Sequence, residues 1–137
     1  MTMTWETVKV GDALPAHDVG PISRFVLALY AGGSGDHNPM HVDSDFAKAG
    51  GMPDVFAHGM LSMAYLAQLL TARCRPEQIR SYSVRFSAIT PVNARLTCKG
   101  IVVERFEAAG ERRLRLQLET VTDRGLVTLQ GDAVIAV

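Results

Sequence analysis

The chain has 137 residues, of which 47% are hydrophobic and 20% are charged, values that are ordinary for a globular protein. Fourteen Lys and Arg residues balance fourteen Asp and Glu residues, so nothing in the net charge favours a nucleic-acid partner or an anionic membrane. At this length we expect one domain, residues 1–137, that buries roughly two-thirds of the surface exposed by the unfolded chain.

Targeting signals are not expected in this sequence. The first residues, MTMTWETVKVGD, lack the basic and then apolar pattern of a signal peptide. The longest mainly apolar segment, residues 56–70, contains His58, Ser62 and Gln68 and falls short of the about 20 apolar residues that a membrane span needs. Two cysteines, Cys74 and Cys98, are too few for a disulfide scaffold. We therefore expect a cytoplasmic protein with reduced thiols and no membrane partner.

Two short helices with a polar segment between them are predicted in the first half. Residues 23–31 are typical of an amphipathic helix that ends at Gly32-Gly33, and residues 43–49 of a second helix with Asp43 as its N-cap. Between them lies SGDHNPMH, residues 34–41. Pro39 lacks an N–H and moves the preceding residue out of the helical region, so Asp36 and His41 do not share a helical face. A turn can still bring these two side chains to one point.

A longer helix is predicted next, in HGMLSMAYLAQLLTARC. Its apolar side chains surround nearly the whole helix, so we expect it to be buried on most sides. Arg73 and Arg75 suit its C-terminal end, and Pro76 stops it. About 17 residues would give a helix roughly 25 Å long.

The second half alternates apolar and polar residues with a period of two, which predicts half-buried strands. The alternation is clear in residues 80–89, 113–119 and 127–135 and weaker in residues 95–107. Ala109-Gly110 and Asp123-Arg124-Gly125 predict turns, so the strands form antiparallel hairpins. We expect an α+β hot-dog fold, in which a curved sheet of six strands wraps around the long central helix.

The polar segment has a functional and a structural interpretation. Asp36 and His41 can hold a water molecule between them and remove its proton, with one of them acting as general base. Alternatively, Asp36 and Asn38 only cap turns, as these residue types often do. Composition alone does not separate the two.

Gly59, near the start of the long helix, also allows two interpretations. Helix N-termini present free N–H groups and a positive dipole end, which could polarise a thioester carbonyl as an oxyanion hole does. Alternatively, Gly59 only starts the helix, with His58 as a partly hydrogen-bonded neighbour.

Other chemistries have weaker support. GGSG matches neither phosphate-loop pattern, and Ser34 and Ser62 lack a G-x-S-x-G context. Cys74 and Cys98 are expected to be structural. No ligand pair has a recognised metal-site spacing, so we predict no metal at the candidate ligands, which are Asp36, His37, His41, Asp43 and His58.

The sequence resembles the MaoC-like dehydratases, which are R-specific enoyl-CoA hydratases of the hydratase 2 type. The resemblance rests on Tyr30, GSGDHNPMH at residues 33–41, Ala47, FAHGML at residues 56–61 and RFSAITPV at residues 85–92. It departs from the family at Met40, where Leu, Ile or Val is usual, and at Asn93-Ala94-Arg95, where many members have Gly-Asp. The resemblance assigns the turn at this second departure a role in gripping the carrier.

The resemblance implies roles for individual residues. Asp36 and His41 would be the catalytic pair, and Asn38 and Pro39 would shape the turn. Gly59 would supply the carbonyl-binding N–H, and we count Asn38 and His58 with it as substrate-binding candidates.

The implied reaction is reversible hydration of trans-2-enoyl thioesters to R-3-hydroxyacyl thioesters, carried on CoA or acyl carrier protein. It requires no metal or redox cofactor. We also expect a homodimer or higher homo-oligomer, because one such sheet leaves an edge strand and one end of the helix uncovered. Hot-dog subunits typically pair into a continuous sheet, which points the same way.

Three alternatives stay open. A hot-dog acyl-CoA thioesterase would polarise the same carbonyl, but water would attack the carbonyl carbon and release a free thiol. A heteromeric dehydratase would use this chain as its catalytic subunit. A non-catalytic acyl-binding module would leave the presence of both Asp36 and His41 without a purpose.

Overall fold

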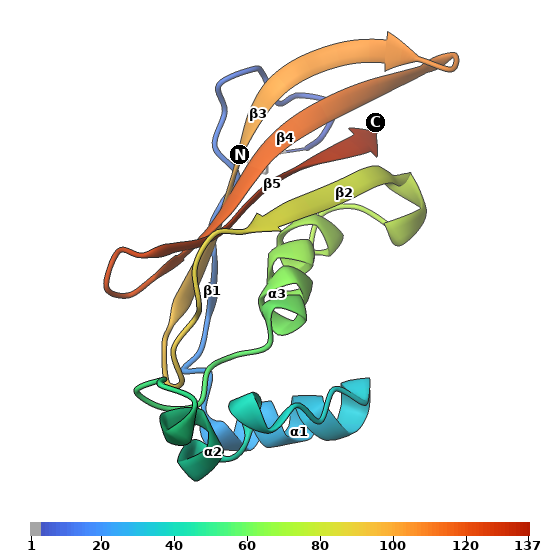
Figure 1. Cartoon of the computed structure of the whole chain (residues 1–137). Helices are drawn as coiled ribbons and strands as arrows, with labels where there is room; N and C mark the ends of the chain where they lie inside the picture. The colour runs from blue at the N-terminus through green and yellow to red at the C-terminus, as the bar shows by residue number, and fades with distance from the viewer. Residues whose placement is uncertain (1–3) are drawn as a thin grey trace.

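A single antiparallel sheet dominates the computed structural model, which describes residues 4–137 (Figure 1). Its order is β1-β3-β4-β5-β2. The strands are β1 (His17–Val19), β2 (Ile79–Phe86), β3 (Leu96–Ala108), β4 (Glu111–Thr122) and β5 (Val127–Ala136).

The expectation of six strands is wrong for the described residues. The N-terminal segment adds only the three residues of β1 and an isolated bridge between Ala13 and Ile101. Pro15 lies between these two pairings, and proline has no N–H to donate to a ladder, so they do not join into one longer strand.

The predicted turns are confirmed. Ala109 and Gly110 connect β3 to β4 with φ values of 51° and 75°, the positive pair that a two-residue hairpin turn requires. The turn between β4 and β5 contains Gly125, with φ of 81°. Both cysteines are free and buried, as expected.

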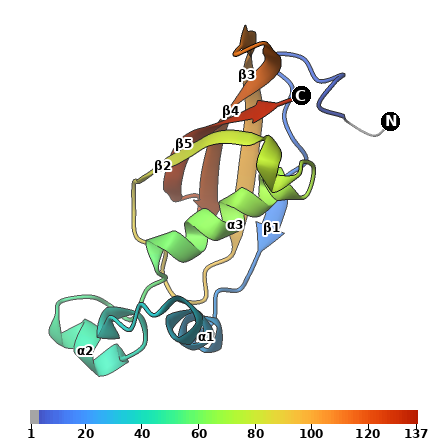
Figure 2. The same ribbon diagram turned by 90° about the vertical axis from the view of Figure 1, so that its right-hand side faces the viewer.

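Helix α3 (Gly59–Thr71) lies against the concave face of the sheet (Figure 2), which is the hot-dog arrangement predicted from the sequence. Its residues Leu66, Leu69 and Leu70 are fully buried and form the main core together with leucines of β4. With 13 residues α3 is shorter than predicted, because Arg73 and Cys74 already bond to the Leu70 carbonyl in a closing turn.

The burial of α3 is less complete than its composition predicts. Leu66, Leu69 and Leu70 are buried in the main core, whereas Met60 is 57% exposed and Ala64 is also exposed. Within one chain, α3 therefore keeps an apolar side that no other described element covers.

Two further helices lie below the N-terminal end of α3 (Figure 1) and share a second, smaller core with it. Helix α1 (Arg24–Ser34) is capped by Ser23, and α2 (Ser44–Ala49) is capped by Asp43 as predicted. Helix α1 continues through the two glycines expected to end it and stops at Gly35, whose φ is 79°. A 3-10 turn, η1 (Pro39–His41), connects the two helices.

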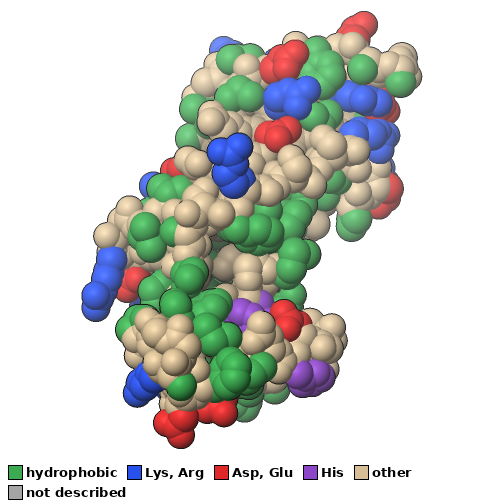
Figure 3. Space-filling model, in the orientation of Figure 1, with side chains coloured by type: hydrophobic (Ala, Val, Ile, Leu, Met, Phe, Trp, Pro, Cys, Tyr) green, Lys and Arg blue, Asp and Glu red, His purple; other side chains and the backbone are tan. Residues whose placement is uncertain are grey.

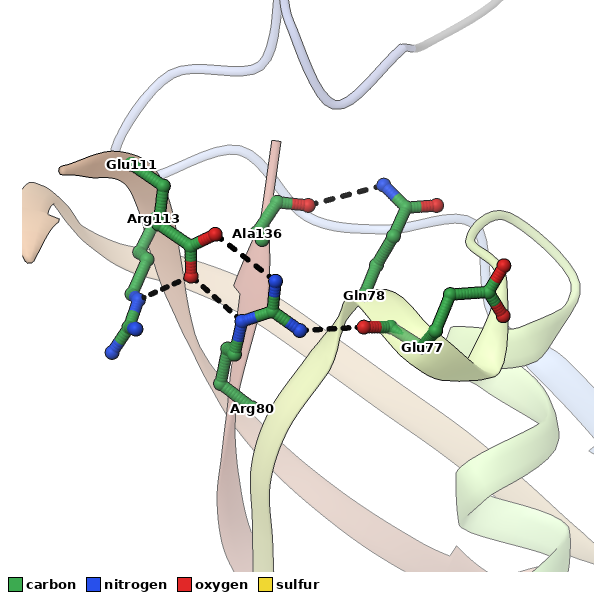
Figure 4. Close-up of polar contacts among 6 residues, drawn as sticks. All are labelled: Glu77, Gln78, Arg80, Glu111, Arg113 and Ala136. Atoms are coloured by element: carbon green, nitrogen blue, oxygen red, sulfur yellow. Dashed lines mark hydrogen bonds and ion pairs between the residues drawn. The ribbon is translucent and has the colours of Figure 1, made fainter. Parts of the chain in front are cut away.

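An ion-pair cluster ties the strands together at the other end of the sheet (Figure 4). Glu111 accepts bonds from Arg80 at 2.6 and 3.0 Å and from Arg113 at 2.9 Å. Gln78, in the 3-10 turn η2 (Pro76–Gln78), donates to the Ala136 carbonyl. No helix in residues 4–137 has the length and hydropathy needed to cross a bilayer.

Candidate active site

The segment Ser34–His41, which we call the polar loop, is held by side-chain oxygens that accept a backbone N–H two residues further on. Ser34 Oγ accepts from Asp36 at 3.1 Å, Asp36 Oδ1 accepts from Asn38 at 3.2 Å, and Asn38 Oδ1 accepts from Met40 at 3.1 Å. Three such turns in succession fix the backbone locally. Asp36 and Asn38 therefore do cap turns, but this role uses only Oδ1 of Asp36 and leaves its Oδ2 free, so the functional interpretation stays open.

Pro39 turns the chain so that the His41 side chain points into the interior of the protein. Asn38 has φ of −56° and ψ of 120°, outside the helical region as predicted, and η1 then carries His41 to a buried position. His41 Nδ1 lies 2.7 Å from the Phe56 carbonyl oxygen. A carbonyl oxygen only accepts, so Nδ1 carries the proton and Nε2 presents a lone pair.

That lone pair faces the free oxygen of Asp36. The distance from His41 Nε2 to Asp36 Oδ2 is 4.0 Å, which is too long for a direct hydrogen bond and suits one water molecule shared by both groups. The Asp36 side chain is 52% exposed and that of His41 only 10%, so the pair lies at the edge of a recess. Figure 3 shows histidine and acidic side chains gathered in the recess between the helical part and the rest of the molecule.

His58 lies under this pair. Its ring stacks on that of His41 with centroids 3.8 Å apart, and its Nε2 donates to the Asp36 carbonyl oxygen at 3.1 Å. Burial lowers the pKa of His58, which keeps the ring neutral beside His41. These contacts make His58 a support of the polar loop, an arrangement that no local pattern indicated. Its predicted contact with substrate stays a prediction.

Gly59 begins α3 at the wall of a cavity of about 550 Å³. The His58 side chain makes no capping bond, so no side chain caps the first turn of α3. The cavity is mainly apolar, and its lining includes His41, Gly59, Met60, Ser62, Phe86 and Leu129.

Phe86 gives a second reason for glycine at position 59. A Cβ atom added to Gly59 would lie 2.7 Å from Cε1 of the Phe86 ring. Phe86 is one of the apolar residues in the alternating run 80–89, which predicts that it faces the core, but it is 53% exposed at the end of β2 and covers the start of α3. Sequence reasoning missed this contact, because it joins residues 27 positions apart in the chain.

Three of the five residues considered as metal ligands come together. Asp36, His41 and His58 each place one ligand atom within 4.8 Å of the others. Of the remaining two, Asp43 caps α2 and His37 is exposed. Because His58 Nε2 already donates to Asp36, only its Nδ1 would be open to a metal without breaking that bond.

The profile of the family described as MaoC like domain matches residues 7–123. The chain belongs to this family of MaoC-like dehydratases. Asn93, the first residue of the departure from the family pattern, has φ of 66°, a conformation that glycine adopts freely and asparagine tolerates.

The chain is similar to several hydratases and dehydratases. It is 31% identical to an (R)-specific enoyl-CoA hydratase of Rhodospirillum rubrum, over 97% of this chain and 90% of that protein. It is 44% identical to 3-hydroxyacyl-thioester dehydratase X of Mycobacterium tuberculosis, over 44% of this chain but only 21% of the relative's length. The solved structure of R-hydratase PhaJ1 from Pseudomonas aeruginosa superposes with a TM-score of 0.84 at 26% identity, covering 97% of this chain and 84% of that one.

Proposed function

We propose that this MaoC-like protein is an R-specific enoyl-thioester hydratase that also catalyses the reverse dehydration. The observation that carries the proposal is the pair of acceptors, His41 Nε2 and Asp36 Oδ2, 4.0 Å apart beside a cavity whose wall includes the free end of α3. Similarity to the R. rubrum hydratase supports the same reaction.

The proposed reaction begins with a water molecule bound between Asp36 and His41. As one of them takes a proton, the water oxygen forms a bond to C3 of the enoyl thioester. The C2–C3 π electrons move toward C1, and negative charge develops on the thioester oxygen. The N–H of Gly59 stabilises that enolate, and the residue that took the proton from water returns it to C2 as the carbonyl reforms. Protons and electrons balance without a metal or redox cofactor.

The test is hydration of crotonyl-CoA, hexenoyl-CoA and longer enoyl-CoA thioesters, followed as loss of enoyl absorbance. Released thiol is measured in the same samples, and the chirality of the 3-hydroxyacyl product is determined. Loss of absorbance without free thiol, giving the R product, is the expected result. Stoichiometric thiol release would instead identify a thioesterase, and activity only on adding a related chain would identify a heteromeric dehydratase.

We further propose that the working form is a homodimer or a higher homo-oligomer. Strand β2 is an edge of the sheet and ends at the exposed Phe86, which lines the cavity together with the exposed Met60. A second copy would cover this apolar side of α3 and pair the edge. Light scattering tests this: a stable 14.9 kDa monomer with full activity at nanomolar concentration would refute it.

A further inference from the structure

Ser62 is a buried side chain whose hydroxyl finds no partner among the residues that the structure describes. The residue is 1% exposed, and its Oγ makes no hydrogen bond within residues 4–137. Buried hydroxyl groups nearly always have a partner, because leaving one unpaired costs free energy. An unpaired hydroxyl at the wall of a cavity is therefore a candidate for a hydrogen bond to a ligand.

The position of Ser62 indicates which ligand atom this is. Ser62 and Gly59 are three residues apart in α3, so they lie on the same face of the helix, and both line the 550 Å³ cavity. Side chains in a helix lean toward its N-terminus, which directs the Ser62 hydroxyl toward the turn that Gly59 begins. The cavity lining also includes the polar residues His41, Ser87 and Thr90, but these lie outside α3, and Met60, Phe86 and Leu129 on its wall are apolar.

We propose that the Ser62 hydroxyl donates a hydrogen bond to the thioester oxygen, beside the Gly59 N–H, as a second donor to the developing enolate. This inference rests on the proposed hydratase function and assigns Ser62 to substrate binding within it. A donor aimed at charge that develops in the transition state acts mainly on turnover rather than on ground-state affinity.

A competing account gives Ser62 a purely structural partner. His58 Nδ1 is also buried without a partner in residues 4–137, and it precedes Ser62 by one helical turn. A change of the Ser62 side-chain rotamer that brought its hydroxyl within hydrogen-bond distance of this nitrogen would pair the two atoms. In that case the hydroxyl would stabilise the fold and leave the reaction unaffected.

Ser62→Ala separates the two accounts through stability and kinetics measured together. If the hydroxyl serves the ligand, the free variant unfolds at the same or a higher temperature than wild type. Its kcat for crotonyl-CoA then falls by about 10²-fold, the lower range for losing an oxyanion donor, with KM changed by less than about threefold. Ser62→Thr, which keeps the hydroxyl, retains more turnover than Ser62→Ala. A lower unfolding temperature with unchanged kcat would overturn the proposal.

The matched control is Thr120→Val. Thr120 is also fully buried, but its hydroxyl is bonded to that of Thr128 at 2.7 Å and does not line the cavity. This variant is expected to lose stability and to keep the kcat of wild type per folded molecule. Thr120→Val therefore measures how much stability and turnover change when a hydroxyl that has a hydrogen-bond partner is removed.

Infrared spectroscopy tests the contact without turnover. Crotonyl-CoA labelled at the thioester carbonyl is bound to Asp36→Asn and to Asp36→Asn/Ser62→Ala, and a second donor predicts a smaller lowering of the carbonyl band in the double variant. Equal band positions would overturn the proposal. A wild-type protein that hydrates no enoyl thioester refutes the proposed function instead, whereas active wild type with equal bands refutes only the assignment of Ser62.

Discussion

The polar loop and the first turn of α3 meet at one site but are built in opposite ways. In the polar loop, each side-chain oxygen of Ser34, Asp36 and Asn38 satisfies a neighbouring backbone N–H. In the first turn of α3, His58 makes no capping bond, and both His58 Nδ1 and Ser62 Oγ are unpartnered within residues 4–137.

This difference indicates that the two regions have different roles in the site. A loop that satisfies its own backbone holds Asp36 and His41 in fixed positions without help from a ligand. A helix end that leaves buried polar atoms unpaired is unfavourable until something binds there. We infer that the polar loop positions the attacking water and that α3 receives the thioester.

The largest effect is expected from Asp36→Asn. The amide oxygen of asparagine can still accept the Asn38 N–H, so the loop keeps its turn, but the side chain cannot take a proton. Hydration of crotonyl-CoA should fall by roughly 10²–10⁴-fold while the unfolding temperature stays near that of wild type. Ser34→Ala is the control, since it removes one bond of the loop and leaves the acceptor pair. Activity within about threefold of wild type in Asp36→Asn would contradict the assignment.

His41→Ala should lower crotonyl-CoA hydration by a similar factor, because it removes the other acceptor for the proton of the water molecule. If the two residues hold one water molecule, the double variant Asp36→Asn/His41→Ala should be little worse than either single variant. Additive losses in the double variant would mean that the two side chains act separately.

The sequence predicted the fold well where the pattern is local. Alternation located the buried leucines of β4, and Ala109-Gly110 located a hairpin turn, because both depend on neighbours in the chain. The prediction that α1 ends at its two glycines is wrong, because Gly32 and Gly33 stay helical.

The features of the candidate site also divide into those set by neighbours in the chain, which could be predicted, and those set by distant segments, which could not. The polar loop could be predicted because its residues are consecutive. The stack of His58 on His41, the ring of Phe86 over Gly59 and the isolation of Ser62 depend on packing between distant segments. No spacing in the sequence carries that information.

Gly59→Ala is expected to have the next-largest effect after the variants of Asp36 and His41, about 10²–10³-fold in turnover, because a methyl group at this position crowds the thioester oxygen. The new Cβ would also meet the Phe86 ring. Phe86→Ala in the same chain removes that second clash. If α3 receives the carbonyl, Gly59→Ala/Phe86→Ala stays slow, and recovery of turnover in the double variant would show that glycine serves only the aromatic contact.

A smaller effect is expected at His58, which links the two regions. Burial lowers its pKa from the usual 6.5, so the unfolded chain takes up this proton more readily than the folded one. His58 therefore lowers stability as the pH falls below about 6.5. His58→Gln, which can still donate to the Asp36 carbonyl but cannot ionise, should show a shallower loss of unfolding free energy between pH 7 and pH 5. His37→Gln, at an exposed position of the same loop, is the control and should follow wild type.

The smallest effect is expected from the ion-pair cluster at the other end of the sheet. Variants of this cluster test whether acid changes the stability of the fold without changing turnover at the site. Bonding to Arg80, with a further contribution from Arg113, lowers the pKa of Glu111 from 4.5 to about 2. A carboxylate with a lowered pKa contributes stability above pH 4.5 and loses it as the pH falls toward 2. Because these side chains are partly exposed, the contribution is screened by solvent and salt. Glu111→Gln should unfold at a slightly lower temperature at pH 7 and depend less on pH between 4.5 and 2, while Glu107→Gln, an exposed neighbour on β3, follows wild type. Crotonyl-CoA turnover at pH 7 should be unchanged in both variants, and a loss of turnover in Glu111→Gln would mean that the far end of the sheet is coupled to the site.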